Sequence, residues 1–69
     1  MLEKRSIRLS GHRTSIALEA EFWAALEALA RTRKQTVAAL ITEIDARRMP
    51  ERPLASALRV YALRPEDRF

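Results

Sequence analysis

The stretch that decides the fold is GHRTSIALEAEFW, Gly11–Trp23, in which the spacing of the apolar residues changes partway along. From Arg13 to Leu18 polar and apolar side chains alternate, and this two-residue repeat is typical of a β-strand. From Phe22 onward the apolar residues recur three or four positions apart, which is the spacing of an amphipathic helix. The sequence therefore predicts a short strand that leads directly into a helix.

Three helices are predicted after this strand. The first covers about residues 20–33, and its acidic N-terminal end and basic C-terminal end both suit the helix dipole. The second begins at Thr36, a good N-cap residue, and ends near Arg48, because the residue before Pro50 disfavours helical backbone. Apolar residues at helical spacing indicate a third helix that begins near Leu54. The predicted core consists of Ile16, Leu18, Phe22, Leu26, Leu29, Leu40, Ile41 and Ile44.

The length of the chain limits how it can be stabilised. A chain of 69 residues forms one small domain, and at this size only roughly 60% of the surface is buried, so its core is marginal. The absence of cysteine excludes disulfides and thiolate metal sites, and the single histidine cannot form a zinc site alone. Oligomerisation is the remaining common source of stability, so we expect a homodimer.

The segment before Gly11 allows two interpretations. Residues 4–10 also alternate between polar and apolar side chains, and Gly11 favours a turn because it tolerates positive φ. These residues form either an extra strand, paired with Arg13–Leu18 as a hairpin, or a flexible basic arm. The sequence pattern leaves both open.

The charge of the chain favours nucleic acid as a partner. The net charge is +4 and the sequence pI is about 10.7, and the positive charge gathers in two places rather than evenly. One group lies in the first eighteen residues and the other at the end of the first predicted helix. His12, beside the turn, is either a solvated turn residue or a hydrogen-bond donor to phosphate. The basic residues in these two groups are Lys4, Arg5, Arg8, Arg13, Arg31, Arg33 and Lys34.

Other classes of function find little support in the sequence. A single glycine cannot make a glycine-rich phosphate loop, and no serine or cysteine nucleophile stands in a recognisable arrangement with His12. We therefore expect no enzyme, no metal and no cofactor. No apolar run approaches the roughly 20 residues that span a membrane, and no secretory signal is apparent. A cytoplasmic protein without membrane contact is expected.

The predicted strand raises the question of its partner. A single strand has unpaired edges, and pairing with the same strand of a second copy removes one of them and makes a two-fold symmetric ribbon. Arg13 and Ser15 then point away from the helices. A two-stranded ribbon fits the major groove of DNA, where outward side chains reach the base edges. The pattern thus predicts a homodimer that binds double-stranded DNA.

The run RTSIALEAEFWAALEALARTRKQTVAALITEI, Arg13–Ile44, resembles the ribbon-helix-helix DNA-binding fold, the class of the Arc and MetJ repressors. With LASALRVYAL, Leu54–Leu63, it is similar to a bacterial subgroup of small ribbon-helix-helix domain proteins. The resemblance implies a mostly α fold with a short N-terminal strand, in an intertwined homodimer whose two strands form an antiparallel ribbon, plus a third helix. We expect a basic arm or extra strand in residues 1–12, the core in residues 13–48, and a linker and C-terminal helix in residues 49–69.

The resemblance also implies which residues contact DNA. The alternate outward residues of the strand, Arg13, Ser15 and Ala17, would contact bases. The backbone at the start of the second helix, Thr36 and Val37, would bind phosphate, in keeping with the affinity of helix N-termini for anions. Ala17 departs from the family pattern, because it lacks a hydrogen-bonding group, although it can contact a thymine methyl.

Three further residues complete the expected site. Lys34 stands where the turn between the helices often has glycine, so that turn is expected to be built differently, with Lys34 adding charge toward phosphate. Arg8, in the N-terminal segment, and His12 are expected to contact DNA from outside the core of the fold.

The function expected first is sequence-specific binding of double-stranded DNA by a homodimer that represses transcription by occupying a promoter. One alternative is an antitoxin, whose segment Pro53–Phe69 would bind a protein toxin and would be disordered past Met49 without it. The other is a dimerisation or protein-interaction module without DNA binding, which Ala17 keeps open.

Overall fold

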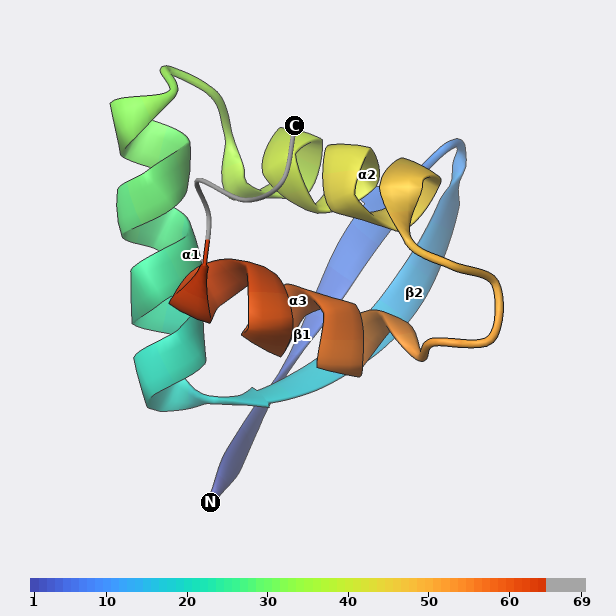
Figure 1. Ribbon diagram of the computed structural model, residues 1–69, viewed down its shortest axis with the longest axis horizontal. Coiled ribbons are helices and arrows are strands. Elements are labelled where there is room, and N and C mark those ends of the chain that lie inside the picture. Colours follow the sequence, from blue (N-terminus) through green and yellow to red (C-terminus); the bar gives the residue numbers. More distant parts are fainter. Residues whose placement is uncertain (65–69) are drawn as a thin grey trace.

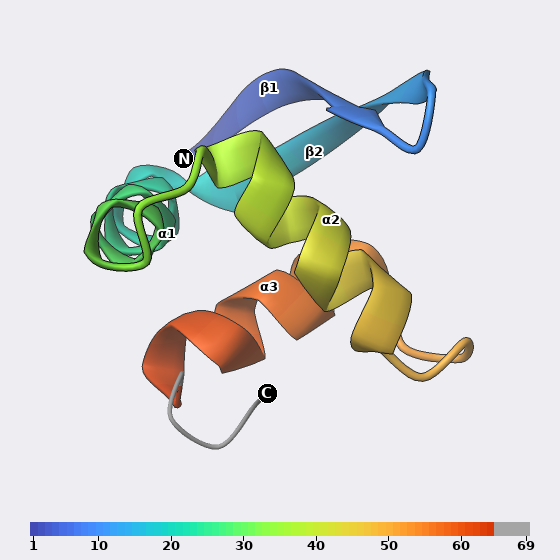
Figure 2. The same cartoon turned by 90° about the horizontal axis from the view of Figure 1, so that it is seen from above.

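The computed structural model describes residues 1–64 and contains a β-hairpin and three helices (Figure 1). Residues 65–69, the end of the expected C-terminal segment, lie outside the described residues. Figure 2 shows the hairpin along one side of the molecule, with the helices on the other side of it. In chain order the elements are β1 (Leu2–Leu9), β2 (His12–Glu19), α1 (Ala20–Thr32), α2 (Val37–Arg47) and α3 (Leu54–Leu63).

The strand predicted from the alternating pattern is paired within its own chain. β1 and β2 are antiparallel neighbours in a two-stranded sheet, with Arg5 opposite Ile16 and Leu9 opposite His12. The prediction of one short unpaired strand is therefore wrong, and of the two interpretations of the N-terminal segment the extra strand is correct. The physical reason is that β1 also has an apolar face, whose Ile7 and Leu9 are buried.

The turn between the strands fixes this pairing. Ser10 and Gly11 are the only residues between the paired Leu9 and His12, and their φ angles are 48° and 89°. Positive φ at both central residues characterises the type I′ turn, whose twist matches that of the flanking strands. Gly11 adopts this conformation without a steric penalty, whereas Ser10 does not.

Helix α1 buries part of the predicted stripe, together with Trp23 beside it. Its buried residues are Trp23, Leu26 and Ala30, while Phe22 and Leu29 are only half-buried. Leu26 is buried as predicted, but Trp23 rather than Phe22 begins the buried stripe. The Trp23 indole lies against β1, where its N–H donates to the Glu3 carbonyl oxygen at 2.8 Å.

Helix α2 agrees closely with the sequence pattern. Thr36 is its N-cap, and the side-chain oxygen accepts a 3.0 Å hydrogen bond from the Ala39 N–H. Leu40, Ile41 and Ile44 are buried as predicted. The helix ends at Arg47, since Arg48 already has extended backbone two residues before Pro50.

Helix α3 closes the core on the side away from the hairpin. It follows Pro53, and its Ala57, Leu58 and Tyr61 are buried among the other helices. The Tyr61 hydroxyl accepts a 2.6 Å hydrogen bond from Arg33, at the end of α1. The buried core thus draws on every element. Its only polar groups among the described residues are the Tyr61 hydroxyl and the Trp23 indole N–H. It consists of Ile7, Leu9, Ile16, Leu18, Trp23, Leu26, Ala30, Leu40, Ile41, Ile44, Ala57, Leu58 and Tyr61.

Candidate nucleic-acid interface

One face of the hairpin points away from the helices. Because opposite residues of a sheet share a face, the register places four cross-strand pairs there: Leu2 with Glu19 at the open end, then Lys4 with Ala17, Ser6 with Ser15, and Arg8 with Arg13 toward the turn. In the last three pairs Ala17 is half-buried and the other five residues are exposed. We call these six residues the ribbon face. It contains Lys4, Ser6, Arg8, Arg13, Ser15 and Ala17.

The ribbon face is positively charged. It carries three cations and no carboxylate, and within residues 1–64 none of these cations forms an ion pair. Arg8 and Arg13 lie directly opposite each other, an arrangement of like charges that is unfavourable in an isolated sheet. Such a surface attracts an anionic partner.

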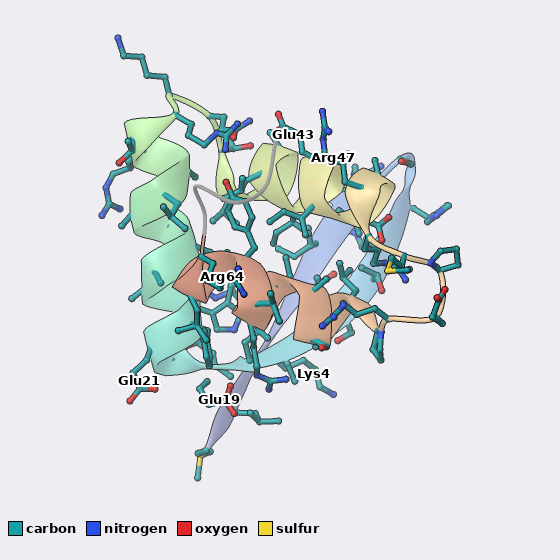
Figure 3. All side chains as sticks on the ribbon, in the orientation of Figure 1. Lys4, Glu19, Glu21, Glu43, Arg47 and Arg64 are labelled. Carbon is teal, nitrogen blue, oxygen red and sulfur yellow. The ribbon has the colours of Figure 1, made fainter. Side chains whose placement is uncertain are left out.

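Glu19, which the register places on the same side of the hairpin as these six residues, already has its carboxylate in an ion pair. Glu19 ends β2 at the same end of the hairpin as Lys4, as Figure 3 shows. It accepts a 2.9 Å hydrogen bond from Arg59 Nε on α3, and this bond holds the pKa of the Glu19 carboxyl below its ordinary value. The charge of Glu19 is therefore paired with Arg59 on α3.

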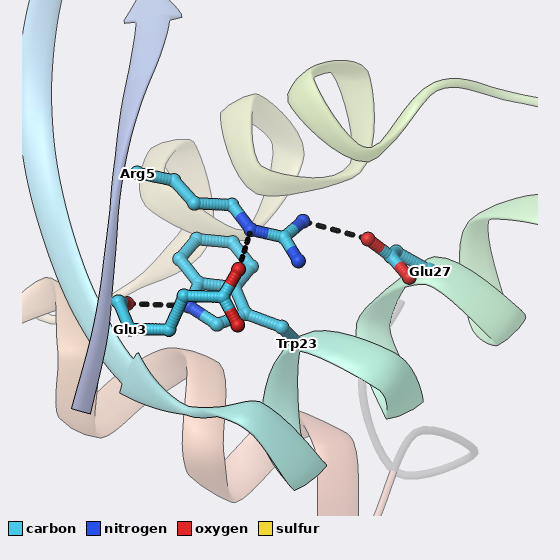
Figure 4. Close-up of polar contacts among 4 residues, drawn as sticks. All are labelled: Glu3, Arg5, Trp23 and Glu27. Carbon is cyan, nitrogen blue, oxygen red and sulfur yellow. Dashed lines mark hydrogen bonds and ion pairs between the residues drawn. The ribbon is translucent and has the colours of Figure 1, made fainter. Parts of the chain in front are cut away.

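On the opposite face of β1, the cation Arg5 is paired with two carboxylates. Arg5 points toward α1, where its guanidinium donates to Glu27 at 2.6 Å and to Glu3 at 3.1 Å (Figure 4). The same guanidinium lies over the Trp23 ring, 4.5 Å from its centroid. The hydrogen bond to Glu27 is the main cause that raises the pKa of Arg5 above its ordinary value. These contacts attach the hairpin to α1 and hold the ribbon face in place.

The structure brings four of the predicted site residues together. Arg8, Arg13, Ser15 and Ala17 all belong to the ribbon face. His12 does not, because it pairs with Leu9 on the face toward the helices, although it is exposed beside the turn.

The ribbon face also holds Lys4, which the sequence placed only among the basic residues of the N-terminal segment, and Ser6, which was not proposed as a contact. The signal that could have found them was the alternation of residues 4–10. It places Ser6 on the same side as Arg8 once this segment is taken as a strand.

The other predicted residues lie in the connection between α1 and α2. Lys34 is exposed with φ 58°, Thr36 caps α2, and Val37 is its first residue and is half-buried. Lys34 thus adopts the left-handed conformation that glycine would adopt. The turn was expected to be built differently, but only its residue type differs and its backbone does not. The first N–H groups of α2 lack partners within the helix, as at any helix N-terminus, and form a favourable position for an anion.

An open groove of about 280 Å³ lies between the end of α2 and α3, apart from the ribbon face. Its lining combines apolar side chains, such as Ile44 and Val60, with the arginines Arg47, Arg48 and Arg52. Among the described residues that line it there is no carboxylate.

The chain belongs to the ribbon-helix-helix domain family, whose model matches residues 2–65 and so includes both strands and all three helices. Proteins of this family are typically DNA-binding regulators or antitoxins rather than enzymes, and they generally bind DNA as dimers. No curated protein and no solved structure matches the chain significantly. Within residues 1–64 no helix combines the length and apolarity needed to cross a membrane.

Proposed function

We propose that the protein binds double-stranded DNA sequence-specifically as a homodimer and represses transcription by occupying promoters in the cytoplasm. The observation that carries this proposal is the ribbon face, an exposed surface that carries three cations on a two-stranded ribbon, while the Glu19 carboxylate on the same side is paired with Arg59. Paired strands lie about 4.8 Å apart, so a single ribbon fits a major groove that is about 12 Å wide.

The chemistry of the side chains assigns a role to each proposed contact. Arg13 can make a bidentate pair with guanine, Ser15 can hydrogen-bond to several base edges, and Ala17 can contact a thymine methyl. Arg8, opposite Arg13, adds a second guanidinium to the same end of the ribbon.

We propose phosphate contacts for residues other than Arg13, Ser15 and Ala17 of β2. Lys34 and the backbone of Thr36 and Val37 would contact phosphate at the N-terminus of α2. His12, exposed beside the turn, would contact phosphate at the edge of the groove.

Because β1 pairs with β2, a second copy is not needed to give β2 a partner strand. Support for the homodimer comes instead from the family, whose members generally bind DNA as dimers, and from the small size of the domain. Dimers would occupy adjacent half-sites of a promoter. The melting temperature of such a dimer should rise with protein concentration.

The order of α3 favours the regulator over the antitoxin. The antitoxin hypothesis expects disorder past Met49 in the free protein, yet α3 contributes Ala57, Leu58 and Tyr61 to the core. The interaction module without DNA binding is distinguished by the following experiment.

Binding-site selection from random duplex DNA, with the full chain, tests the proposal. An enriched motif is expected, and Arg13→Ala should weaken binding to it by about 1–3 kcal/mol and relax the preference at one position. Arg52→Ala, which removes the same charge far from the hairpin, is the matched control and should keep the preference. Flat recovery of sequences, or an Arg13→Ala variant that binds cognate and scrambled duplexes as the parent does, would contradict the proposal.

The phosphate contacts are tested by salt dependence. Lys34→Ala should weaken binding to all duplexes alike. If each chain of the dimer loses one phosphate contact, the slope of log affinity against log salt should become shallower by about 1.8, at roughly 0.9 for each contact. An unchanged slope would remove Lys34 from the interface.

A further inference from the structure

The groove between the end of α2 and α3 is not used by the proposed function. Residues 48–53 join these two helices in a loop at one side of the molecule (Figure 1). The volume of the groove is about 280 Å³. Since a water molecule occupies about 30 Å³ of liquid, a groove of this size has room for a ligand of about ten non-hydrogen atoms. It is therefore large enough for a small organic molecule.

Much of the lining of the groove is apolar. Ile44, Ala57 and Tyr61 are its buried apolar residues, whereas Val60 is half-buried and Met49 is 61% exposed. A methionine side chain is flexible and polarizable, so it adapts its shape to an apolar ligand. An aliphatic chain in the groove would remove the exposed Met49 side chain from water, which is favourable.

The arginines of the lining differ in how their charge is compensated. Arg48 Nε donates to the Asp45 carboxylate at 2.7 Å, and Arg48 Nη1 donates to the Arg52 carbonyl oxygen at 2.8 Å. The Arg52 guanidinium donates to the neutral Ser56 hydroxyl at 3.2 Å and has no carboxylate partner within residues 1–64. The Arg52 backbone N–H donates to the Met49 carbonyl at 3.0 Å, which holds both residues in one turn. The groove thus joins an apolar lining to a cation without a carboxylate.

The short length of the groove favours a small molecule over a docked helix. The residues of α3 that line it run from Ala57 to Tyr61, which corresponds to about 6 Å along the helix axis. An amphipathic helix docks through side chains from position i to i+7, which extend over about 10 Å. The groove therefore matches a ligand with one short apolar chain.

We infer that this groove binds an aliphatic monocarboxylate of about eight carbons, with its chain against Met49 and Val60 and its carboxylate on Arg52. The planar guanidinium of arginine suits a carboxylate, because it can donate two parallel hydrogen bonds. The inference goes beyond the proposed function, since it adds a small-molecule site at a place apart from the ribbon face.

The test is an NMR titration of the full chain without DNA. The ligand is sodium octanoate, added up to about 20 mM, since ligands of about ten atoms commonly bind in the millimolar range. We expect saturable shifts of the backbone amide signals of residues 47–52 and 57–61. Octanamide, which has the same chain without the charge, should bind at least about threefold more weakly. Sodium acetate at the same concentrations should cause no saturable shift.

Variants of the groove separate the contribution of charge from that of apolar contact. Arg52→Gln should weaken octanoate binding by about 3- to 10-fold, because it removes a charge-assisted contact at an exposed site. Met49→Ser should weaken it by about two- to fivefold through the lost apolar contact. Arg31→Gln is the matched control, since it removes the same charge from an exposed residue outside the groove. Arg52 and Met49 are exposed, so both variants should melt as the parent does.

Three results would overturn the inference: no saturable shift with octanoate, equal affinities for octanoate and octanamide, or an Arg52→Gln variant that binds octanoate as tightly as Arg31→Gln does. Octanoate-induced shifts centred on the ribbon face instead of the groove would overturn it as well. Because the titration contains no DNA, its failure leaves the proposed DNA binding intact. Flat recovery in the binding-site selection would in turn leave the octanoate result intact.

Discussion

The indole N–H of Trp23 donates a 2.8 Å hydrogen bond to the backbone carbonyl of Glu3, and this contact joins the first turn of α1 to the start of β1 (Figure 4). Trp23 is fully buried, and the Arg5 guanidinium covers its ring. The placement of the ribbon face relative to the helices therefore depends on this side chain.

Replacing Trp23 by alanine should lower the free energy of unfolding by about 3–5 kcal/mol, because the change leaves a large cavity and removes the donor to Glu3. The measurement is denaturant unfolding followed by circular dichroism, at one fixed protein concentration. Phe22→Ala is the matched comparison, since Phe22 is only half-buried. A larger loss of unfolding free energy for Phe22→Ala than for Trp23→Ala would show that Phe22 begins the buried stripe, as the sequence pattern predicted.

Replacing Lys34 by glycine should separate stability from DNA binding. Lys34 has φ 58°, and for residues other than glycine a left-handed conformation costs roughly 1–2 kcal/mol. Relief of this strain is partly offset by the greater freedom of glycine in the unfolded chain. The melting temperature should therefore rise modestly, while affinity for every duplex falls. A lower melting temperature would show that the Lys34 side chain stabilises the turn.

The ion pair between Glu19 and Arg59 should make stability depend on pH in the acid range. Arg59 donates a hydrogen bond that holds the pKa of Glu19 below its ordinary value. The stabilisation is thus complete above the unfolded-state pKa of roughly 4.3 and is lost as the pH falls through the lower folded-state pKa.

An NMR titration of the Glu19 carboxyl measures this directly. In Arg59→Gln its pKa should move up toward the ordinary value, whereas Arg52→Gln should leave it in place. An unchanged pKa in Arg59→Gln would mean that another group stabilises the carboxylate.

A disulfide between positions 6 and 15 should form within one chain. Ser6 and Ser15 lie directly opposite each other, at a Cα separation of about 4.5–5.5 Å that a disulfide can bridge. The chain has no cysteine of its own. The double variant Ser6→Cys, Ser15→Cys should therefore lose its free thiols and migrate as a monomer on a non-reducing gel.

The mismatched pair Ser6→Cys, Ala17→Cys is the control, because it is diagonal in the register and too far apart to close readily. Cross-linked dimers from the matched pair would show that β1 pairs with β2 of another copy. Persistent free thiols in that pair would contradict the register itself.

The helices and most of the core were predictable because their apolar spacing is strong and local. Thr36 was correctly assigned as the N-cap of α2, and Leu40, Ile41 and Ile44 are buried as predicted. The prediction for α1 was wrong at Phe22 because Phe22 and Trp23 are neighbours, and either can begin a buried stripe that includes Leu26. The choice is made by β1, twenty positions away from Trp23 in sequence.

The partner of β2 was not predictable for the same reason. The alternation of residues 4–10 suits both a strand and a flexible arm. The choice between a strand and an arm is decided by contacts between distant positions, such as Arg5 with Glu27. The outward placement of Arg13, Ser15 and Ala17 followed from period-two alternation alone and is confirmed by the register. Their contacts with DNA stay a prediction.

The two-residue turn at Ser10 and Gly11 has a consequence for how this protein can change over evolution. The outward and inward side chains of each strand alternate, so single substitutions on the ribbon face can alter the preferred sequence while the packing against the helices stays the same. A single residue inserted or deleted at the turn would instead shift the register by one and exchange the two faces. Ile7 and Leu9 would then meet solvent, and Arg8 would meet the core. New sequence preferences are therefore accessible by substitution, whereas the length of the turn is held constant by folding.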